Sequence, residues 1–127
     1  MKRILFAFAL ILFTTSIALS QEKKAVIAAE GGTIYDFGDI KGSDGPVTHV
    51  FTIKNEGDAP LTITNATSSC GCTKPEYTES PIAPGKTGEL KVTYSPGGST
   101  GPFNKTISVY SNGKSGTYVL YIKGNVF

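Results

Sequence analysis

The feature that most constrains the fold of this sequence is a two-residue alternation of side chains, broken at intervals by glycine and proline. In residues 47–55, one alternating set is Val47, His49, Phe51 and Ile53, and the other is Thr48, Val50, Thr52 and Lys54. Successive side chains of a strand point to opposite faces of its sheet. The pattern therefore predicts a strand with one buried face.

The same alternation recurs in short segments. It predicts strands at residues 33–40, 47–55, 61–67, 88–94, 103–111 and 117–124, and it allows a short seventh strand in the proline-rich connection at 68–86. Clusters of turn-forming residues at 42–46, 56–60 and 95–102 separate these segments. The spacing leaves room for strands and turns but for no long helix.

Composition supports an all-β domain. Residues 21–127 contain 13 Thr, 8 Ile and 7 Val but only three Leu and no Met. Side chains branched at Cβ suit a pleated sheet, whereas helices favour Leu, Ala and Met. We therefore predict an immunoglobulin-like, two-sheet antiparallel β-sandwich of about seven strands. A closed barrel is the main alternative.

Three local predictions follow from the pattern. Ile34 and Phe37 are candidates for the core, and His49 is expected to point inward as a hydrogen-bonded structural histidine. The pair Asn112-Gly113 predicts a hairpin with a type I′ turn, in which both central residues have positive φ.

The N-terminus has the features of a secretory signal peptide. A basic start is followed by an apolar run at residues 4–13, which is too short to span a bilayer, and Ala18-Leu19-Ser20 fits a cleavage site before Gln21. We predict a removed signal peptide at 1–20, a flexible N-terminal segment at 21–32 and an immunoglobulin-like domain at 33–127. The product is expected to be exported, to the periplasm or out of the cell.

Charge argues against two classes of partner. Removal of Lys2 and Arg3 with the leader leaves 10 basic and 10 acidic side chains. A neutral domain without a basic run lacks the electrostatic footprint of nucleic-acid binding or of attraction to an anionic membrane. We predict a protein or cell-envelope partner of unknown identity, no nucleic acid, and no membrane insertion after signal removal.

Several motifs resemble one known family. They are Phe37-Gly38-x-Ile40, His49-x-Phe51-x-x-Lys54-Asn55, Gly57-x-x-Pro60-Leu61, Ser69-Cys70-Gly71-Cys72-Thr73, Pro81-Ile82-x-Pro84-Gly85 and Ile107-x-Val109-x-Ser111-Asn112. In this order and spacing, from about Ile34 to Phe127, the chain resembles the exported bacterial family catalogued as domain of unknown function 1573. The resemblance implies an immunoglobulin-like fold related to that of major sperm protein domains, and export. It implies no activity.

Cys70-Gly71-Cys72 is the candidate for chemistry, and three interpretations stay open. The thiols could simply pack, bind a soft metal ion, or form a disulfide, which an oxidising compartment favours. In extended backbone the two Cβ atoms lie too far apart for a bridge, so the chain would have to kink, and Gly71 permits this. A three-residue loop gives only about 1.6 kcal/mol of entropic stabilisation, so such a bridge would be easily reduced.

Metal binding and catalysis have weaker support. Cys70, Cys72 and the single His49 supply three soft ligands, one fewer than a closed zinc site requires. The sequence has no C-x-x-C motif at a helix start, no nucleophile elbow and no phosphate-binding glycine loop. We predict no metal, no other cofactor and no enzymatic activity.

The last hairpin offers a candidate partner face. Tyr110, Val119 and Tyr121 fall on its expected outer side, where they would form a partly apolar surface. The N-terminal segment, a neighbouring strand or ordinary surface scatter could also account for them. The sequence therefore predicts a binding or structural interaction module, with a thiol–disulfide redox or soft-metal-binding protein acting through Cys70 and Cys72 as the alternative.

Overall fold

The computed structural model describes residues 23–127, so the predicted signal peptide and the cleavage site between Ser20 and Gln21 lie outside the described residues. Within this range the chain forms eight strands and one short 3-10 helix, η1 (Gly42–Asp44). The described part of the chain contains no helix that is long and apolar enough to cross a membrane.

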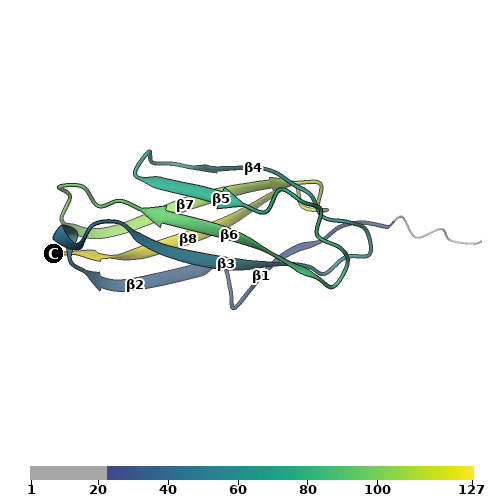
Figure 1. Ribbon diagram of the computed structural model, residues 1–127, viewed down its shortest axis with the longest axis horizontal. Helices are drawn as coiled ribbons and strands as arrows, with labels where there is room; N and C mark the ends of the chain where they lie inside the picture. The colour runs from purple at the N-terminus through teal and green to yellow at the C-terminus, as the bar shows by residue number, and fades with distance from the viewer. Residues whose placement is uncertain (1–22) are drawn as a thin grey trace, which may run out of the picture.

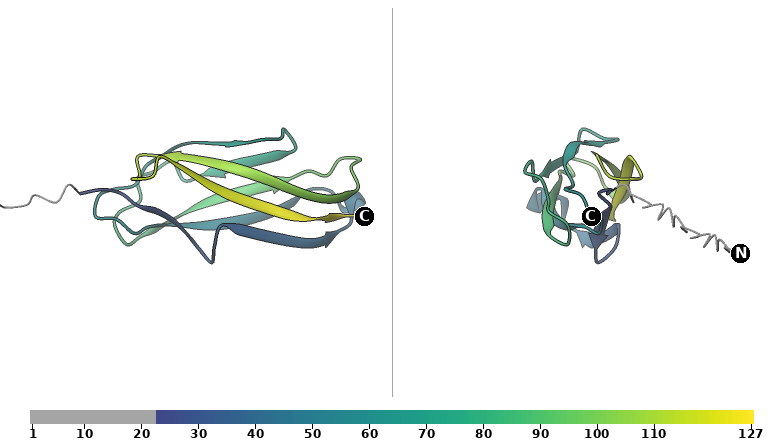
Figure 2. Two further views of the ribbon diagram at one scale, coloured as in Figure 1. Left: turned by 180° about the vertical axis from the view of Figure 1, so that it is seen from behind. Right: turned by 90° about the vertical axis from the view of Figure 1, so that its right-hand side faces the viewer.

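The strands form two four-stranded sheets that pack face to face (Figures 1 and 2). The first sheet has the order β1 (Ile27–Glu30), β3 (Val47–Asn55), β6 (Thr87–Tyr94), β5 (Thr73–Tyr77). The second has the order β2 (Ile34–Ile40), β8 (Thr117–Val126), β7 (Gly101–Ser111), β4 (Ile63–Ser68). The predicted all-β, immunoglobulin-like sandwich is confirmed.

Two details of the sandwich differ from the prediction. Residues 23–127 contain eight strands because the N-terminal segment adds β1, and the strand in the proline-rich connection is β5. All strand pairs are antiparallel except β2 and β8, which are parallel. A parallel pair joins segments far apart in sequence, so local alternation carries no signal for it.

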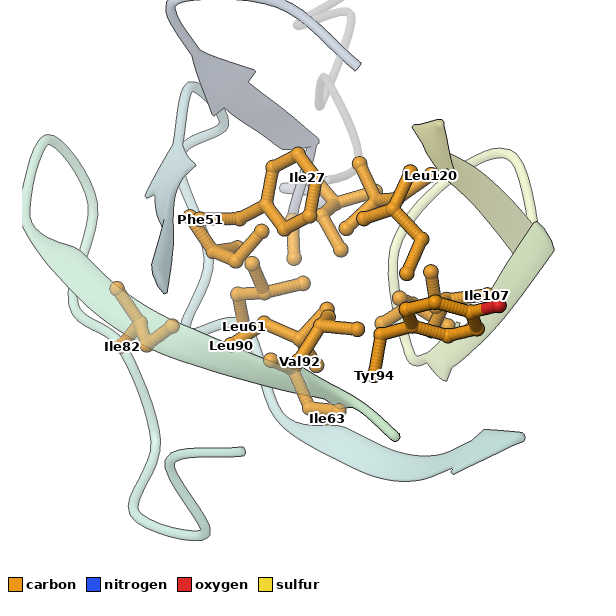
Figure 3. Packing of buried hydrophobic residues seen from close by; sticks show 14 of the residues in the cluster. Ile27, Phe51, Leu61, Ile63, Ile82, Leu90, Val92, Tyr94, Ile107 and Leu120 are labelled. Atoms are coloured by element: carbon orange, nitrogen blue, oxygen red, sulfur yellow. The ribbon is translucent and has the colours of Figure 1, made fainter. Parts of the chain in front are cut away.

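The core lies between the sheets and is built from inward-facing side chains of both (Figure 3). Its largest fully buried apolar residues are Ile53, Leu61, Leu90, Ile107, Leu120, Ile122, Val92 and Val109. The alternation predicted for residues 47–55 is confirmed, because burial in β3 alternates along the strand and Phe51 and Ile53 are buried.

The prediction that residues 21–32 are flexible is wrong for residues 25–30. Ile27–Glu30 pairs antiparallel with β3, in register from Ile27 opposite Asn55 to Glu30 opposite Thr52. Ala25 and Ile27 are buried in the core. The apolar run at 25–29 is too short to show a clear alternation and follows a polar start, and its order depends on the edge of β3 that it covers.

A buried asparagine ties this first strand to the rest of the sandwich. The Asn55 side chain is fully buried. Its Oδ1 accepts hydrogen bonds from the backbone N–H groups of Val26 (3.3 Å) and Gly57 (3.0 Å), and its Nδ2 donates to the carbonyls of Ala59 (2.7 Å) and Ile82 (2.9 Å). One amide therefore satisfies four backbone groups from three segments.

The hairpin between β7 and β8 is confirmed, but its turn type is not. Asn112 and Gly113 do not have positive φ; Gly116 does, at 74°. The Asn112 side chain instead accepts from the N–H of Thr62 and donates to the carbonyl of Pro60. These tertiary hydrogen bonds, rather than a tight turn, account for the asparagine.

Candidate functional site

The two predicted cysteines lie in the turn between β4 and β5. This turn, the loop 95–100 and the C-terminus share one end of the sandwich (Figure 1). Cys70 and Cys72 are joined by a disulfide, with their Cα atoms 5.3 Å apart. Of the three interpretations of the cysteines, the disulfide is the one that the structure shows.

The reason predicted for the kink needs correction. Gly71 lies in the turn, but its φ is not positive, and a Cβ atom at this position would contact nothing within 4 Å. Neither backbone conformation nor space demands glycine there. The turn is held by backbone hydrogen bonds, from Thr73 N–H to the Cys70 carbonyl (3.1 Å) and from Ser95 N–H to the Cys72 carbonyl (2.8 Å).

The two sulfur atoms have different surroundings. The backbone N–H of Cys72 donates to Sγ of Cys70 at 3.3 Å. Sγ of Cys72 lies 3.9 Å from the Thr73 hydroxyl, a longer and weaker contact. A backbone N–H dipole therefore points at the Cys70 sulfur, where it would stabilise negative charge if the bridge opened.

A hollow of about 390 Å³ opens beside the disulfide. Both cysteines line it, together with residues from β6, from the loop 95–100 and from β7. Tyr94 and Phe103 contribute stacked rings whose centroids are 4.0 Å apart. Both rings are buried, so they join the wall of the hollow to the core.

Lys105 is the only Lys, Arg, Asp or Glu among the residues that line this hollow. Lys105 lies on β7 on the same side of the strand as Phe103 and Ile107, which are buried. No carboxylate of the described residues forms an ion pair with it. Sequence analysis missed Lys105, although its phase in the alternation places it on the inward face.

The residues of the predicted partner face lie on the outer side of the second sheet. In the register of β7 and β8, Ser108 is opposite Val119 and Thr106 is opposite Tyr121. Tyr110 and Tyr121 are exposed, and Val119 is half-buried. The described N-terminal segment does not cover them, because β1 belongs to the other sheet.

Ile34 extends this face, so its predicted place in the core is wrong. It is 58% exposed and lies directly beside Tyr121 in the parallel pairing of β2 with β8. Phe37, the other core candidate of this strand, does pack against the core. We call Ile34, Tyr110, Val119 and Tyr121 the tyrosine face.

His49 points inward as predicted, but its partners are aromatic rings. Its imidazole stacks on Tyr35 of the opposite sheet, with centroids 3.5 Å apart, and meets Phe51 edge-on. Among the described residues it forms no hydrogen bond. Burial lowers the pKa of His49, which favours the neutral imidazole.

None of the described residues form a group of three or more His, Cys, Asp or Glu side chains that could hold a metal ion. The sulfur atoms are bonded to each other, and a thiolate is the form that binds metal. His49 is engaged with Tyr35 and Phe51 on β3. The geometry therefore supplies no ligand set for the soft metal ion considered above.

The two packed sheets define the class of protein, an immunoglobulin-like β-sandwich with an exposed aromatic face and a disulfide at one end. The family model "Protein of unknown function (DUF1573)" matches residues 29–126, and the chain belongs to this family. The resemblance seen in the motifs is thereby confirmed.

Solved structures share the fold at low sequence identity. A protein of unknown function from Porphyromonas gingivalis W83 matches with a TM-score of 0.71 and 19% identity, over 85% of this chain and 50% of its own. The secreted serine protease VesC from Vibrio cholerae matches with 0.61 and 15%, over 80% and 23%. A PapD-like domain of human CEP192 matches with 0.60 and 9%, over 82% and 85%.

This chain therefore spans half of the Porphyromonas protein and about a quarter of the protease. A comparison of the sequence with curated proteins gives no match. At these identities the structural likeness shows the fold alone.

Proposed function

We propose that this protein is an exported interaction module that binds a protein partner of the cell envelope through the tyrosine face. The observation that carries the proposal is the gathering of Ile34, Tyr110 and Tyr121, each more than a third exposed, on one sheet surface. Aromatic side chains are enriched in protein interfaces because they bury large areas with little loss of conformational freedom.

The surroundings of the tyrosine face support a protein partner. Thr106 and Ser108 lie between its apolar residues in the register of β7 and β8. Their hydroxyls can donate and accept hydrogen bonds, as the polar parts of an interface do. The presence of the fold as part of longer chains, such as the secreted protease VesC, agrees with a role as a module.

Export is the first part of the proposal to test. When the full chain is expressed in a Gram-negative host, we expect it in the periplasmic extract with the mass of a chain that begins at Gln21. A chain that lacks residues 2–20 should stay in the cytoplasm, since it has no signal to be recognised. Recovery of the full chain with residues 1–20 still attached would contradict export by a cleaved signal.

Partner binding is tested with a photo-crosslinking amino acid at Tyr121 in living cells. We expect one discrete adduct from Tyr121, whose protein component is then identified and purified. Binding of that component should weaken about tenfold or more in an Ile34→Ser/Tyr121→Ser variant, because the central apolar contacts of an interface carry most of its free energy.

Val50 provides the matched control, because it is also exposed but lies on the outer face of the other sheet. A crosslinker at Val50 should give no such adduct, and Val50→Ser should bind like the wild type. Equal adducts from both positions, or unchanged affinity of the double variant, would show that the tyrosine face is not the binding surface.

A further inference from the structure

The disulfide has an unusual place for a structural bridge. It joins residues only two positions apart, whereas a bridge that restricts the unfolded chain joins distant segments. The turn around it is already held by backbone hydrogen bonds, including one from Ser69 N–H to the Thr106 carbonyl. The sandwich therefore does not need the bridge to keep its two sheets together.

The bridge is also open to a reaction partner. Cys70 and Cys72 are both half-buried, Cys72 against the edge of the core, and Gly71 between them is exposed. The space where a Cβ of Gly71 would lie is empty, and the hollow opens beside both cysteines. A thiolate must reach one sulfur in line with the S–S bond, so access of this kind is required for exchange.

The surroundings distinguish the two sulfur atoms as leaving groups. In thiol–disulfide exchange the sulfur that is more stable as a thiolate leaves faster. The Cys72 N–H donates to Sγ of Cys70, so Cys70 is the better leaving group. Lys105 lines the same hollow as both cysteines, and its positive charge favours a thiolate there without distinguishing between the two. No Asp or Glu lines the hollow to oppose that charge.

From this arrangement we infer that Cys70–Cys72 is a thiol–disulfide exchange site, which oxidises a pair of cysteine thiols in an exported polypeptide. This activity goes beyond the proposed partner binding and uses a different end of the molecule.

The exchange reaction is balanced in atoms and electrons, because the Cys70–Cys72 disulfide is itself the oxidant. A substrate thiol loses its proton, and its thiolate attacks Sγ of Cys72; the Cys70–Cys72 bond breaks, and Cys70 leaves as a thiolate that then takes up a proton. The second substrate thiolate attacks the sulfur of its own neighbour in the mixed disulfide and releases Cys72. The substrate gains a disulfide, and two electrons and two protons reduce Cys70 and Cys72.

The test uses the full mature chain, oxidised and folded, with a synthetic two-cysteine peptide as the probe. We expect the peptide to reduce the native bridge. The reaction is stopped with acid, the free thiols are alkylated, and the intact mass shows how many have formed. Lys105→Gln should slow the reaction about threefold, because the leaving thiolate loses a stabilising charge. Lys91→Gln removes an exposed lysine on the other sheet and should react like the wild type.

The site of attack is mapped with glutathione, a single thiol that forms a mixed disulfide but cannot resolve it. After a short reaction we expect glutathione on Cys72 and the alkylating agent on Cys70. A bridge that reacts only after unfolding, an unchanged rate for Lys105→Gln, or glutathione on Cys70 would each overturn the inference. Reaction with glutathione but not with the peptide would overturn a polypeptide dithiol as the substrate.

The exchange reaction of Cys70–Cys72 can be tested independently of partner binding at the tyrosine face. A Cys70→Ala/Cys72→Ala variant should lose the exchange reaction and lower its melting temperature by no more than about 6 to 13 °C, since the three-residue loop contributes only about 1.6 kcal/mol. The same variant should still give the Tyr121 crosslink. This variant and Ile34→Ser/Tyr121→Ser therefore distinguish a failure of the exchange proposal from a failure of the binding proposal.

Discussion

Replacement of Asn55 by alanine is expected to destabilise the sandwich by about 3 to 5 kcal/mol, enough to unfold much of a marginally stable domain. The variant removes one buried amide but leaves four backbone groups behind it, at Val26, Gly57, Ala59 and Ile82. Each buried group without a partner costs about 1 to 3 kcal/mol, although water reaches those nearest the surface.

Thermal unfolding followed by circular dichroism measures this effect. At about 4 to 8 °C per kcal/mol, the melting temperature should fall by more than 12 °C. Asn104→Ala is the matched control, because Asn104 is exposed on β7, and it should leave the melting temperature almost unchanged. A fall for Asn55→Ala as small as that of the control would mean that the four hydrogen bonds do not hold the N-terminal segment.

The second large effect is expected for Gly57→Ala, at about 3 kcal/mol or more. A Cβ atom on Gly57 would lie 2.6 Å from the Val26 nitrogen and 2.9 Å from the Ala25 carbonyl carbon, and closer still to the Lys24 carbonyl oxygen. These are backbone atoms, so no side chain can rotate away. The segment before β1 must move, and its hydrogen bonds with Glu56 and Asp58 would break.

Hydrogen exchange shows where in the sandwich Gly57→Ala acts as well as how strongly it destabilises the fold. The amides of β1 that bond to β3 should lose protection in Gly57→Ala, while those in the centre of β7 and β8 change less. Gly71→Ala is the matched control: its φ is also not positive, but its Cβ would meet no atom within 4 Å. If the two variants were equally stable, the close approach of Gly57 to the N-terminal segment would be refuted.

Asn55 and Gly57 give a physical reason for two of the motifs that mark this family. In the Lys54-Asn55 and Gly57-x-x-Pro60-Leu61 motifs, two residues that look like turn formers contact the chain before β1: Asn55, which is buried, and Gly57, which is half-buried. Neither residue lies at a candidate functional site. These motifs therefore identify the fold of the family and do not reveal an activity.

The two candidate sites also differ in what the sequence could reveal. Tyr110, Val119 and Tyr121 share one phase of the alternation in neighbouring strands, so their common face was predictable. Ile34 joins them only through the parallel pairing of β2 with β8, which has no local signal. Cys70 and Cys72 were visible as a pair, but the hollow also needs Tyr94 and Lys105 from other strands.

By itself the sequence determined six of the eight strands of the described residues, most of their buried faces, the hairpin and the family, because these depend on side-chain alternation and on motifs that are local in the chain. Only the tertiary structure decided which strands are neighbours, that residues 27–30 form a strand, and which groups surround the disulfide. The physical reason is that a strand completes its hydrogen bonds with a partner elsewhere in the chain, and the identity of that partner is set by packing of the whole core.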